Sequence, residues 1–181
     1  MRRTWFLSLA VTVLALAADT APAQPMALTP VKILPHAYYF RGHTGMADPA
    51  NQGFMSNAGF VVTPDGVVVF DALGTPALGQ AMIYAIRTVT AQPIRRVIVS
   101  HYHADHFYRL QAFKAVGAAV WAHENGRQYL SSDTAPSRLA QRKVDLKPWV
   151  NEDTRLMRPT AGCISTRVRR FRSRSAACIS A

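Results

Sequence analysis

The sequence predicts an α/β fold, and two observations carry this prediction. Between residues 67 and 131, short β-branched runs alternate with segments of helical periodicity, as is typical of strands connected by helices. At the start of this region, apolar runs at residues 58–62 and 67–70 flank the segment Thr63-Pro-Asp-Gly66. That segment favours a hairpin turn, because proline presets φ and glycine supplies a positive φ. We therefore expect a hairpin followed by strand–helix units.

Local patterns assign the other elements in chain order. Residues 31–41 form a first, irregular strand interrupted by Pro35, and residues 42–53 form a polar loop. A helix begins with Pro76 at its first position and runs through residue 88, where apolar residues recur at helical spacing. Residues 95–100 form a buried strand, after which Asp105 caps a helix that ends at Gly117. A strand at 118–122 and a helix at 124–130 follow, whereas residues 132–158 are largely polar and receive no helix or strand.

The first 23 residues have the pattern of an export signal. A short basic start, Met1-Arg-Arg3, precedes an apolar run from Trp5 to Ala18, and Ala21-Pro-Ala23 offers the small residues that a signal peptidase reads. The apolar run is short for a membrane span, although an uncleaved N-terminal anchor is the alternative. We expect Sec-type export and a periplasmic or secreted protein, with no membrane association after cleavage.

The charge of the chain does not indicate a nucleic-acid partner. The net charge is +11, but residues 24–160 hold 14 basic and 9 acidic side chains, about +5 in total, without a basic stripe interleaved with aromatic residues. Residues 159–181 are rich in Arg and Ser and contain both cysteines, to which we assign no role. We interpret this tail as an aberrant, out-of-frame end, with a genuine disordered basic tail as the alternative. The expected partner is a small-molecule substrate.

The segment His101-Tyr-His-Ala-Asp-His106 carries the functional signal. It lies between a predicted strand and a predicted helix, and imidazole and carboxylate groups are the ligands that zinc takes. In an extended segment, residues two apart point the same way, so His101 and His103 can converge on one ion. After the chain turns, Asp105 and His106 can face a second ion. The spacing therefore predicts a two-metal site, with a solvated histidine-rich turn as the alternative.

Two segments resemble the metallo-β-lactamase superfamily: residues 57–71, which end in Phe70-Asp71, and residues 97–106, which contain the histidine motif. The resemblance covers residues 31–158 and implies the N-terminal half of an αββα sandwich, a mixed β-sheet flanked by helices, C-terminally truncated. It places a partial domain at residues 24–158. It also implies two zinc ions, the first bound by His101 and His103 and the second by Asp105 and His106. Asp71 would support the metal loop, and Asp105 would orient the attacking hydroxide or shuttle its proton.

The expected function is that of an exported zinc-dependent hydrolase, in which a metal-bound hydroxide attacks an ester, thioester, lactone or lactam carbonyl. The alternatives are a truncated, non-catalytic remnant and a periplasmic zinc-binding module that uses the same loop. His36, His43 and His123 are interpreted as structural, because a neutral histidine commonly satisfies a local backbone partner.

Overall fold

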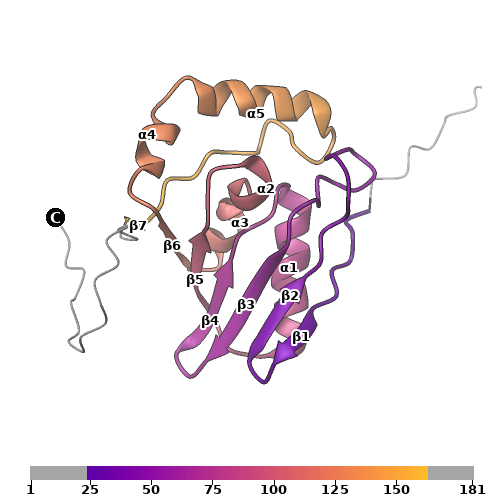
Figure 1. The fold of residues 1–181 in the computed structure, drawn as a ribbon, viewed down its shortest axis with the longest axis vertical. Helices are drawn as coiled ribbons and strands as arrows, with labels where there is room; N and C mark the ends of the chain where they lie inside the picture. Colours follow the sequence, from indigo (N-terminus) through magenta and orange to yellow (C-terminus); the bar gives the residue numbers. More distant parts are fainter. Residues whose placement is uncertain (1–23, 163–181) are drawn as a thin grey trace, which may run out of the picture.

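The computed structural model describes residues 24–162, which form one mixed seven-stranded sheet with helices around it (Figure 1). The strands are β1 (Val31–Leu34), β2 (Ala37–Phe40), β3 (Ala58–Thr63), β4 (Gly66–Phe70), β5 (Ile94–Val99), β6 (Ala119–Ala122) and β7 (Ala161–Gly162), and their order in the sheet follows the sequence. Strands β1 to β4 pair antiparallel, and β4 to β7 pair parallel. The predicted α/β class and mixed sheet are confirmed.

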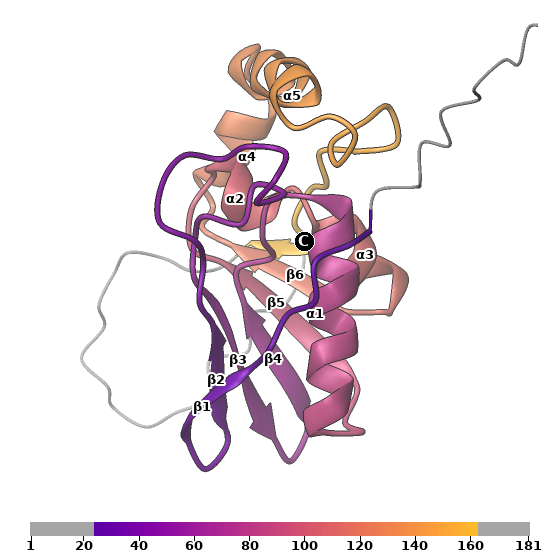
Figure 2. The same cartoon turned by 90° about the vertical axis from the view of Figure 1, so that its right-hand side faces the viewer.

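The helices connect the parallel strands. They are α1 (Pro76–Val89), α2 (Ala104–Phe107), α3 (Leu110–Ala115), α4 (Gly126–Leu130) and α5 (Thr134–Asp145). Helices α1 and α3 lie on one side of the sheet (Figure 2), whereas α4 and α5 lie beyond the carboxyl end of β5 (Figure 1). Within residues 24–162, no helix has the length and apolar character needed to cross a membrane.

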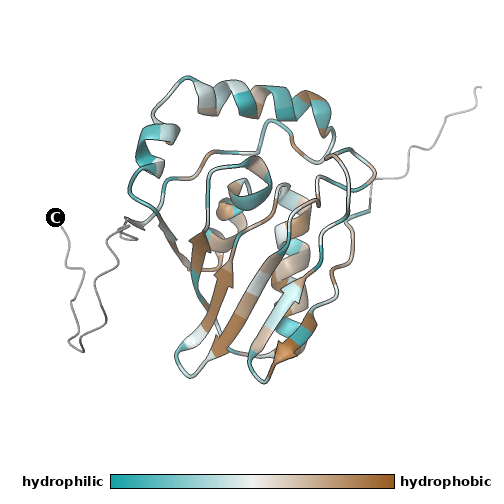
Figure 3. Ribbon diagram, in the orientation of Figure 1, coloured by the Kyte–Doolittle hydropathy of each residue, from teal (hydrophilic) through white to brown (hydrophobic). Residues whose placement is uncertain are grey.

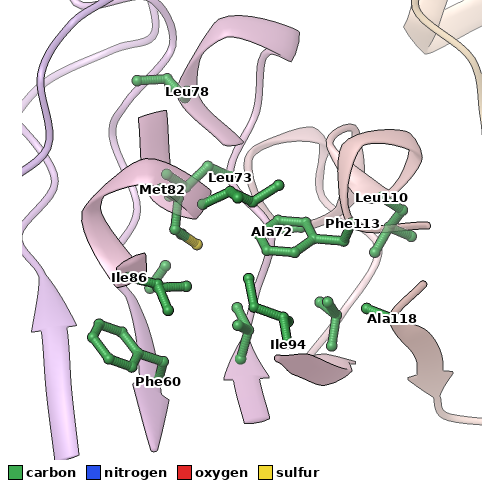
Figure 4. Close-up of a cluster of buried hydrophobic side chains, with 14 of the residues drawn as sticks. Phe60, Ala72, Leu73, Leu78, Met82, Ile86, Ile94, Leu110, Phe113 and Ala118 are labelled. Atoms are coloured by element: carbon green, nitrogen blue, oxygen red, sulfur yellow. The ribbon is translucent and has the colours of Figure 1, made fainter. Parts of the chain in front are cut away.

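The core lies between the sheet and α1. The apolar side chains of α1, which recur at the predicted helical spacing, fill it. The buried residues of the helix are Leu78, Gly79, Met82, Ile83, Ala85 and Ile86. Phe60 of β3 points toward Ile86, and Met82 lies close to Leu73 (Figure 4). Much of β4 and β5 is hydrophobic (Figure 3). Each fully buried side chain of this size contributes roughly 1.5–3 kcal/mol, so this layer holds the carboxyl ends of β4 and β5 in place.

The hairpin between β3 and β4 forms at the predicted turn. Thr63 pairs with Gly66, which leaves Pro64 and Asp65 at the tip. Gly66 has a φ of 125°, and a Cβ at this position would lie 2.6 Å from the carbonyl oxygen of Pro93. Only glycine fits this turn, since a side chain would be strained and would also clash.

Three sequence-based predictions about elements are wrong. Residues 31–41 form two strands rather than one, because Leu34 pairs with Ala37 across a two-residue turn at Pro35. The predicted interruption at Pro35 is confirmed, and the pairing of β1 is irregular between Lys32 and Leu34. The helix expected after the histidine motif is split into α2 and α3. Asp105 does not cap it: residue 103 occupies the N-cap of α2, and no side chain makes a cap hydrogen bond there.

Residues 132–158, for which no helix was predicted, contain helix α5. Of its twelve residues, Ala135 alone is fully buried, so the helix lacks the wide apolar stripe on which the prediction relied. The last strand extends the sheet past the expected domain end at residue 158. The backbone N–H of Thr160 donates to the carbonyl oxygen of Val120 at 2.9 Å, and β7 then pairs with β6. The expected signal at residues 1–23 and the remaining tail from residue 163 lie outside the described residues.

The sheet face opposite α1 is less covered. Phe70, Ile98 and Trp121 are successive neighbours across β4, β5 and β6, and alternation along each strand places them opposite the buried Val69 and Val97. Phe70 is 44% exposed, whereas Val69 and Val97 are fully buried. Arg96 lies over the ring of Trp121, with its Cζ 4.7 Å from the ring centroid. Within the described residues, one face of the sheet therefore carries the core.

Candidate metal centre

The histidine motif lies at the carboxyl ends of β4 and β5. These strands run parallel, with Phe70 paired to Ile98, so the residues that follow each strand meet at one edge of the sheet. Two backbone hydrogen bonds connect the two segments. The N–H of Asp71 donates to the carbonyl oxygen of Ile98 at 2.9 Å, and the N–H of Ala72 donates to the backbone carbonyl oxygen of His106 at 2.7 Å. Asp71 has a positive φ of 63°, a conformation that Asp tolerates better than most residues. The exit of β4 is therefore bonded directly to the motif.

The carboxylate of Asp71 holds both ends of the motif. Its Oδ1 accepts a hydrogen bond from the backbone N–H of Ser100 and its Oδ2 accepts one from the Ser100 hydroxyl, each at 2.8 Å. The same Oδ2 lies 2.9 Å from Nδ1 of His106, an ion-pair distance without the alignment of a hydrogen bond. Asp71 is 8% exposed. It thus positions the loop, as the resemblance implied, rather than facing the open side of the site.

The first pair of predicted ligands is His101 and His103. The Nε2 atom of His101 lies 3.1 Å from Nδ1 of His103, and Nδ1 of His101 lies 3.0 Å from the Ser100 hydroxyl. The ring of His101 also approaches that of His106, with centroids 3.9 Å apart. The three predicted imidazole ligands are thus brought into one cluster.

The second pair is Asp105 and His106. Oδ2 of Asp105 lies 3.2 Å from Nε2 of His106. The hydroxyl of Ser56, from the segment that precedes β3, donates to the backbone carbonyl of Asp105 at 2.9 Å. The loop before β3 therefore fixes the backbone of the second pair, as Asp71 fixes the side chain of His106.

The electrostatics follow from these contacts. Burial alone would lower the pKa of His106, but the carboxylates of Asp105 and Asp71 outweigh it and raise the pKa to about 9. Burial alone would raise the pKa of Asp105, but the contact with His106 outweighs it, and the pKa lies below its ordinary value. Burial and then the neighbouring His106 and His103 lower the pKa of His101. His106 is a cation between two carboxylates, so a metal ion must displace its proton on binding.

The four donors fit zinc in type, and the two atoms of each pair lie close together. Zinc takes imidazole nitrogen and carboxylate oxygen, and neighbouring donors of a tetrahedral zinc lie roughly 3.3 Å apart, given Zn–N distances of about 2.0–2.1 Å. The His101–His103 and Asp105–His106 donor pairs, at 3.1 and 3.2 Å, are close to that separation. Within residues 24–162, no three or more His, Cys, Asp or Glu side chains are arranged around one point as a metal site requires. The assignment of two donors to each of two ions therefore stays a prediction.

A cleft of about 310 Å³ opens beside the motif. One wall is the motif itself and the other is helix α5; the lining residues are Met55, His103, Ala104, Asp105, Arg138, Gln141, Arg142 and Asp145. Its volume lies at the lower end of the range for small-molecule sites. The predicted ligands His103 and Asp105 thus face a space that a small substrate can enter.

Some residues that position the site lie elsewhere in the chain and were not among the predicted site residues. Ser56 and Ser100 carried no motif, and Arg138 lies in a helix that was not assigned. The sequence offers no strong signal for α5, because its residues form no wide apolar stripe. Of the histidines interpreted as structural, His123 accepts a hydrogen bond from the backbone N–H of Asn125 at 3.2 Å, which fits that interpretation.

Comparison with known families agrees with the resemblance found in the sequence. A family model described as the metallo-β-lactamase superfamily matches residues 51–169. None of the curated proteins matches the chain significantly.

Solved structures provide more distant similarities. The stereoselective inverting sec-alkylsulfatase Pisa1 from Pseudomonas sp. is 24% identical, with a TM-score of 0.48, over 64% of this chain and 18% of that one. A HARLDQ-motif mutant of the metallo-β-lactamase from Cronobacter sakazakii is 26% identical, with a TM-score of 0.42, over 54% and 35%. The metallo-β-lactamase from Pontibacter korlensis is 22% identical, with a TM-score of 0.45, over 54% and 44%. The chain spans less than half the length of each of these three structures.

Proposed function

The chain belongs to the metallo-β-lactamase superfamily, a family of hydrolases, and from this premise we propose that it is an exported zinc-dependent hydrolase of small carbonyl compounds. The observation that carries the proposal is the gathering of four zinc-type donors, from His101, His103, Asp105 and His106, at the edge of the sheet. The substrate class is an ester, thioester, lactone or lactam, which the cleft of about 310 Å³ is large enough to admit.

In this proposal His101 and His103 hold one zinc ion, and Asp105 and His106 hold the other. When bound, zinc supplies Lewis acidity and lowers the pKa of water, so that a nucleophile is available at neutral pH. Asp71 keeps the ring of His106 oriented through its Nδ1 atom, which leaves Nε2 as the donor. The carboxylate of Asp105, with its backbone fixed by Ser56, accepts the proton of the attacking water and passes it to the leaving group.

A second candidate is a zinc-binding module without turnover. It is favoured by the finding that, in the part of the chain that the structure describes, no three or more His, Cys, Asp or Glu side chains are grouped as a metal site requires. Two protein ligands hold zinc less tightly than three or four do. The two candidates therefore differ in turnover and not in which residues bind.

Hydrolysis and metal content together test the proposal. The zinc-loaded full chain is assayed with chromogenic ester, thioester, lactone and lactam substrates, before and after treatment with a chelator. We expect hydrolysis that the chelator abolishes and added zinc restores, and a loss of at least about 100-fold in Asp105→Asn. Asp65→Asn, in the exposed turn between β3 and β4, is the matched control and should retain full activity. Bound zinc without hydrolysis of any substrate would favour the binding module instead.

Export has its own test. Residues 1–23 are fused to a phosphatase that lacks its own signal and is active only outside the cytoplasm. Activity of the fusion, and its loss when Leu14 in the apolar run is changed to Arg, would support export. An inactive fusion would contradict it.

A further inference from the structure

Helix α5 presents a row of polar side chains to the candidate metal centre. The four residues that line the cleft are spaced i, i+3, i+4 and i+7, which is one face of a helix: Arg138, Gln141, Arg142 and Asp145. The opposite wall includes His103 and Asp105. In Figure 1 the helix lies across the carboxyl end of the parallel strands, above α2, and in Figure 3 much of it is hydrophilic. Polar groups of α5 and the predicted metal ligands therefore line one cleft.

The charges in this row are not all neutralised. Asp145 accepts hydrogen bonds from Gln141 at 2.7 Å and from Arg142 at 3.4 Å, so both of its carboxylate oxygens are used. Arg138 is exposed, and within residues 24–162 its guanidinium forms neither an ion pair nor a hydrogen bond. Asp105, across the cleft, is already in contact with His106. The α5 wall thus offers a guanidinium whose donors are free to bind a ligand.

We propose that Arg138, assisted by Arg142 one turn further along α5, binds a carboxylate on the substrate and so selects for anionic carbonyl compounds. The inference rests on the proposed hydrolase function, because it assigns the carboxylate to the end of the substrate that faces α5. The reacting carbonyl then faces His103 and Asp105 across the cleft.

The chemistry of the guanidinium supports a carboxylate in particular. Its planar N–H donors match the two oxygens of a carboxylate, and such charge-assisted pairs are stronger than neutral hydrogen bonds. Residues four apart on a helix lie on the same face, so one carboxylate can contact Arg138 while lying close to Arg142. A neutral substrate of the same shape gains none of this.

The test uses a charged probe and its neutral isostere. The zinc-loaded full chain is titrated with phenylacetate and with phenylacetamide, and dissociation constants are measured by ligand-observed NMR at fixed ionic strength. The variants are Arg138→Gln, Arg138→Lys and the matched control Arg87→Gln, which removes an exposed arginine from α1. Circular dichroism melts confirm that all variants fold as the wild type does.

We expect phenylacetate to bind Arg138→Gln roughly five- to tenfold more weakly than the wild type, the usual effect of one charged hydrogen-bonding pair at a partly solvated site. Arg138→Lys should recover part of the loss, and Arg87→Gln should match the wild type. Phenylacetamide should bind equally weakly to all four proteins. Unchanged phenylacetate affinity in Arg138→Gln, or no binding to the wild type at all, would overturn the inference.

A kinetic measurement separates this inference from the proposed function. S-(4-carboxyphenyl) thioacetate and its neutral carboxamide analogue are hydrolysed with detection of the released thiol. A loss in kcat/KM for the charged thioester alone in Arg138→Gln, mainly through KM, supports the inference. Equal rates for the two thioesters in every variant would contradict it while leaving the hydrolase function intact. If neither thioester is hydrolysed but phenylacetate binding still depends on Arg138, the hydrolase proposal fails and the anion site remains.

Discussion

The most informative stability experiment concerns Arg109, which lies between α2 and α3. Its side chain is 1% exposed, and its Nε and Nη1 atoms have no hydrogen-bond partner within the described residues. Burial lowers the pKa of this guanidinium well below its ordinary value, and no carboxylate within residues 24–162 opposes the shift. Gly79 of α1 leaves room for it, since a Cβ there would lie 2.5 Å from Nε. The arginine is accommodated sterically but not electrostatically.

Arg109→Met should therefore stabilise the protein. Each buried donor without a partner costs about 1–3 kcal/mol, and replacing buried charged groups by apolar side chains of similar volume is commonly neutral or stabilising by about 1–4 kcal/mol. Methionine is unbranched and can follow the path of the arginine stem. We expect a gain of about 2 kcal/mol in the free energy of unfolding, or about 4–8 °C in Tm for a domain of this size.

Thermal and urea unfolding in the presence of a chelator measure this effect without a contribution from bound metal. Arg87→Met, at an exposed position of α1, is the control and should change stability by less than about 0.5 kcal/mol. If Arg109→Met is less stable than the wild type, the guanidinium has a partner after all, and the reasoning fails.

Three further predictions address the loop and the sheet. Asp71→Asn removes the charge beside His106 and weakens the hydrogen bond from the backbone N–H of Ser100. Zinc affinity should fall by roughly 10–100-fold. An unchanged dissociation constant for zinc would show that Asp71 does not orient His106. The folded pKa of His106, about 9, exceeds the ordinary 6.5, so the stability that this group contributes is present below pH 6.5 and is lost as the pH rises through 9. Chelator-treated protein should lose stability across this window and His106→Gln should lose less, whereas parallel pH profiles would contradict the assignment. Phe60 is 1% exposed and Phe70 is 44% exposed. Phe60→Ala should therefore lower the free energy of unfolding by about 3–5 kcal/mol, and Phe70→Ala should lower it clearly less. Equal losses of stability in urea unfolding would mean that the sheet face opposite α1 is covered too.

Elements with strong local patterns were predictable. The Pro-Asp-Gly turn and the apolar spacing of α1 lead to structures that agree with the prediction within a residue or two. Both depend on backbone preferences and on one buried face, which short sequence windows contain. Helix α5 was not predictable in this way, because Ala135 is its one fully buried residue. Its position depends on contacts with the loop before β3, such as the hydrogen bond from the Trp149 side chain that follows it to the carbonyl oxygen of Pro49.

In the candidate site too, residues close together in the sequence were predictable and residues far apart were not. The four donors lie within six residues, so their chemistry was readable from the sequence, and the resemblance supplied the supporting role of Asp71. Ser56 contacts the motif across 49 residues of sequence, and Arg138 faces it from helix α5, which follows α2 after three further elements, α3, β6 and α4. Such long-range placement follows from strand order and helix packing, which a single sequence does not contain.

Zinc content tests the central claim that residues 101–106 form the metal centre. The full chain, its His103→Ala variant and a His36→Ala control are loaded with zinc and dialysed, and the metal is measured by mass spectrometry. Wild type and control should retain zinc, whereas His103→Ala should lose it, because the first pair would be left with His101 alone. Zinc content in His103→Ala equal to that of the wild type would contradict the account.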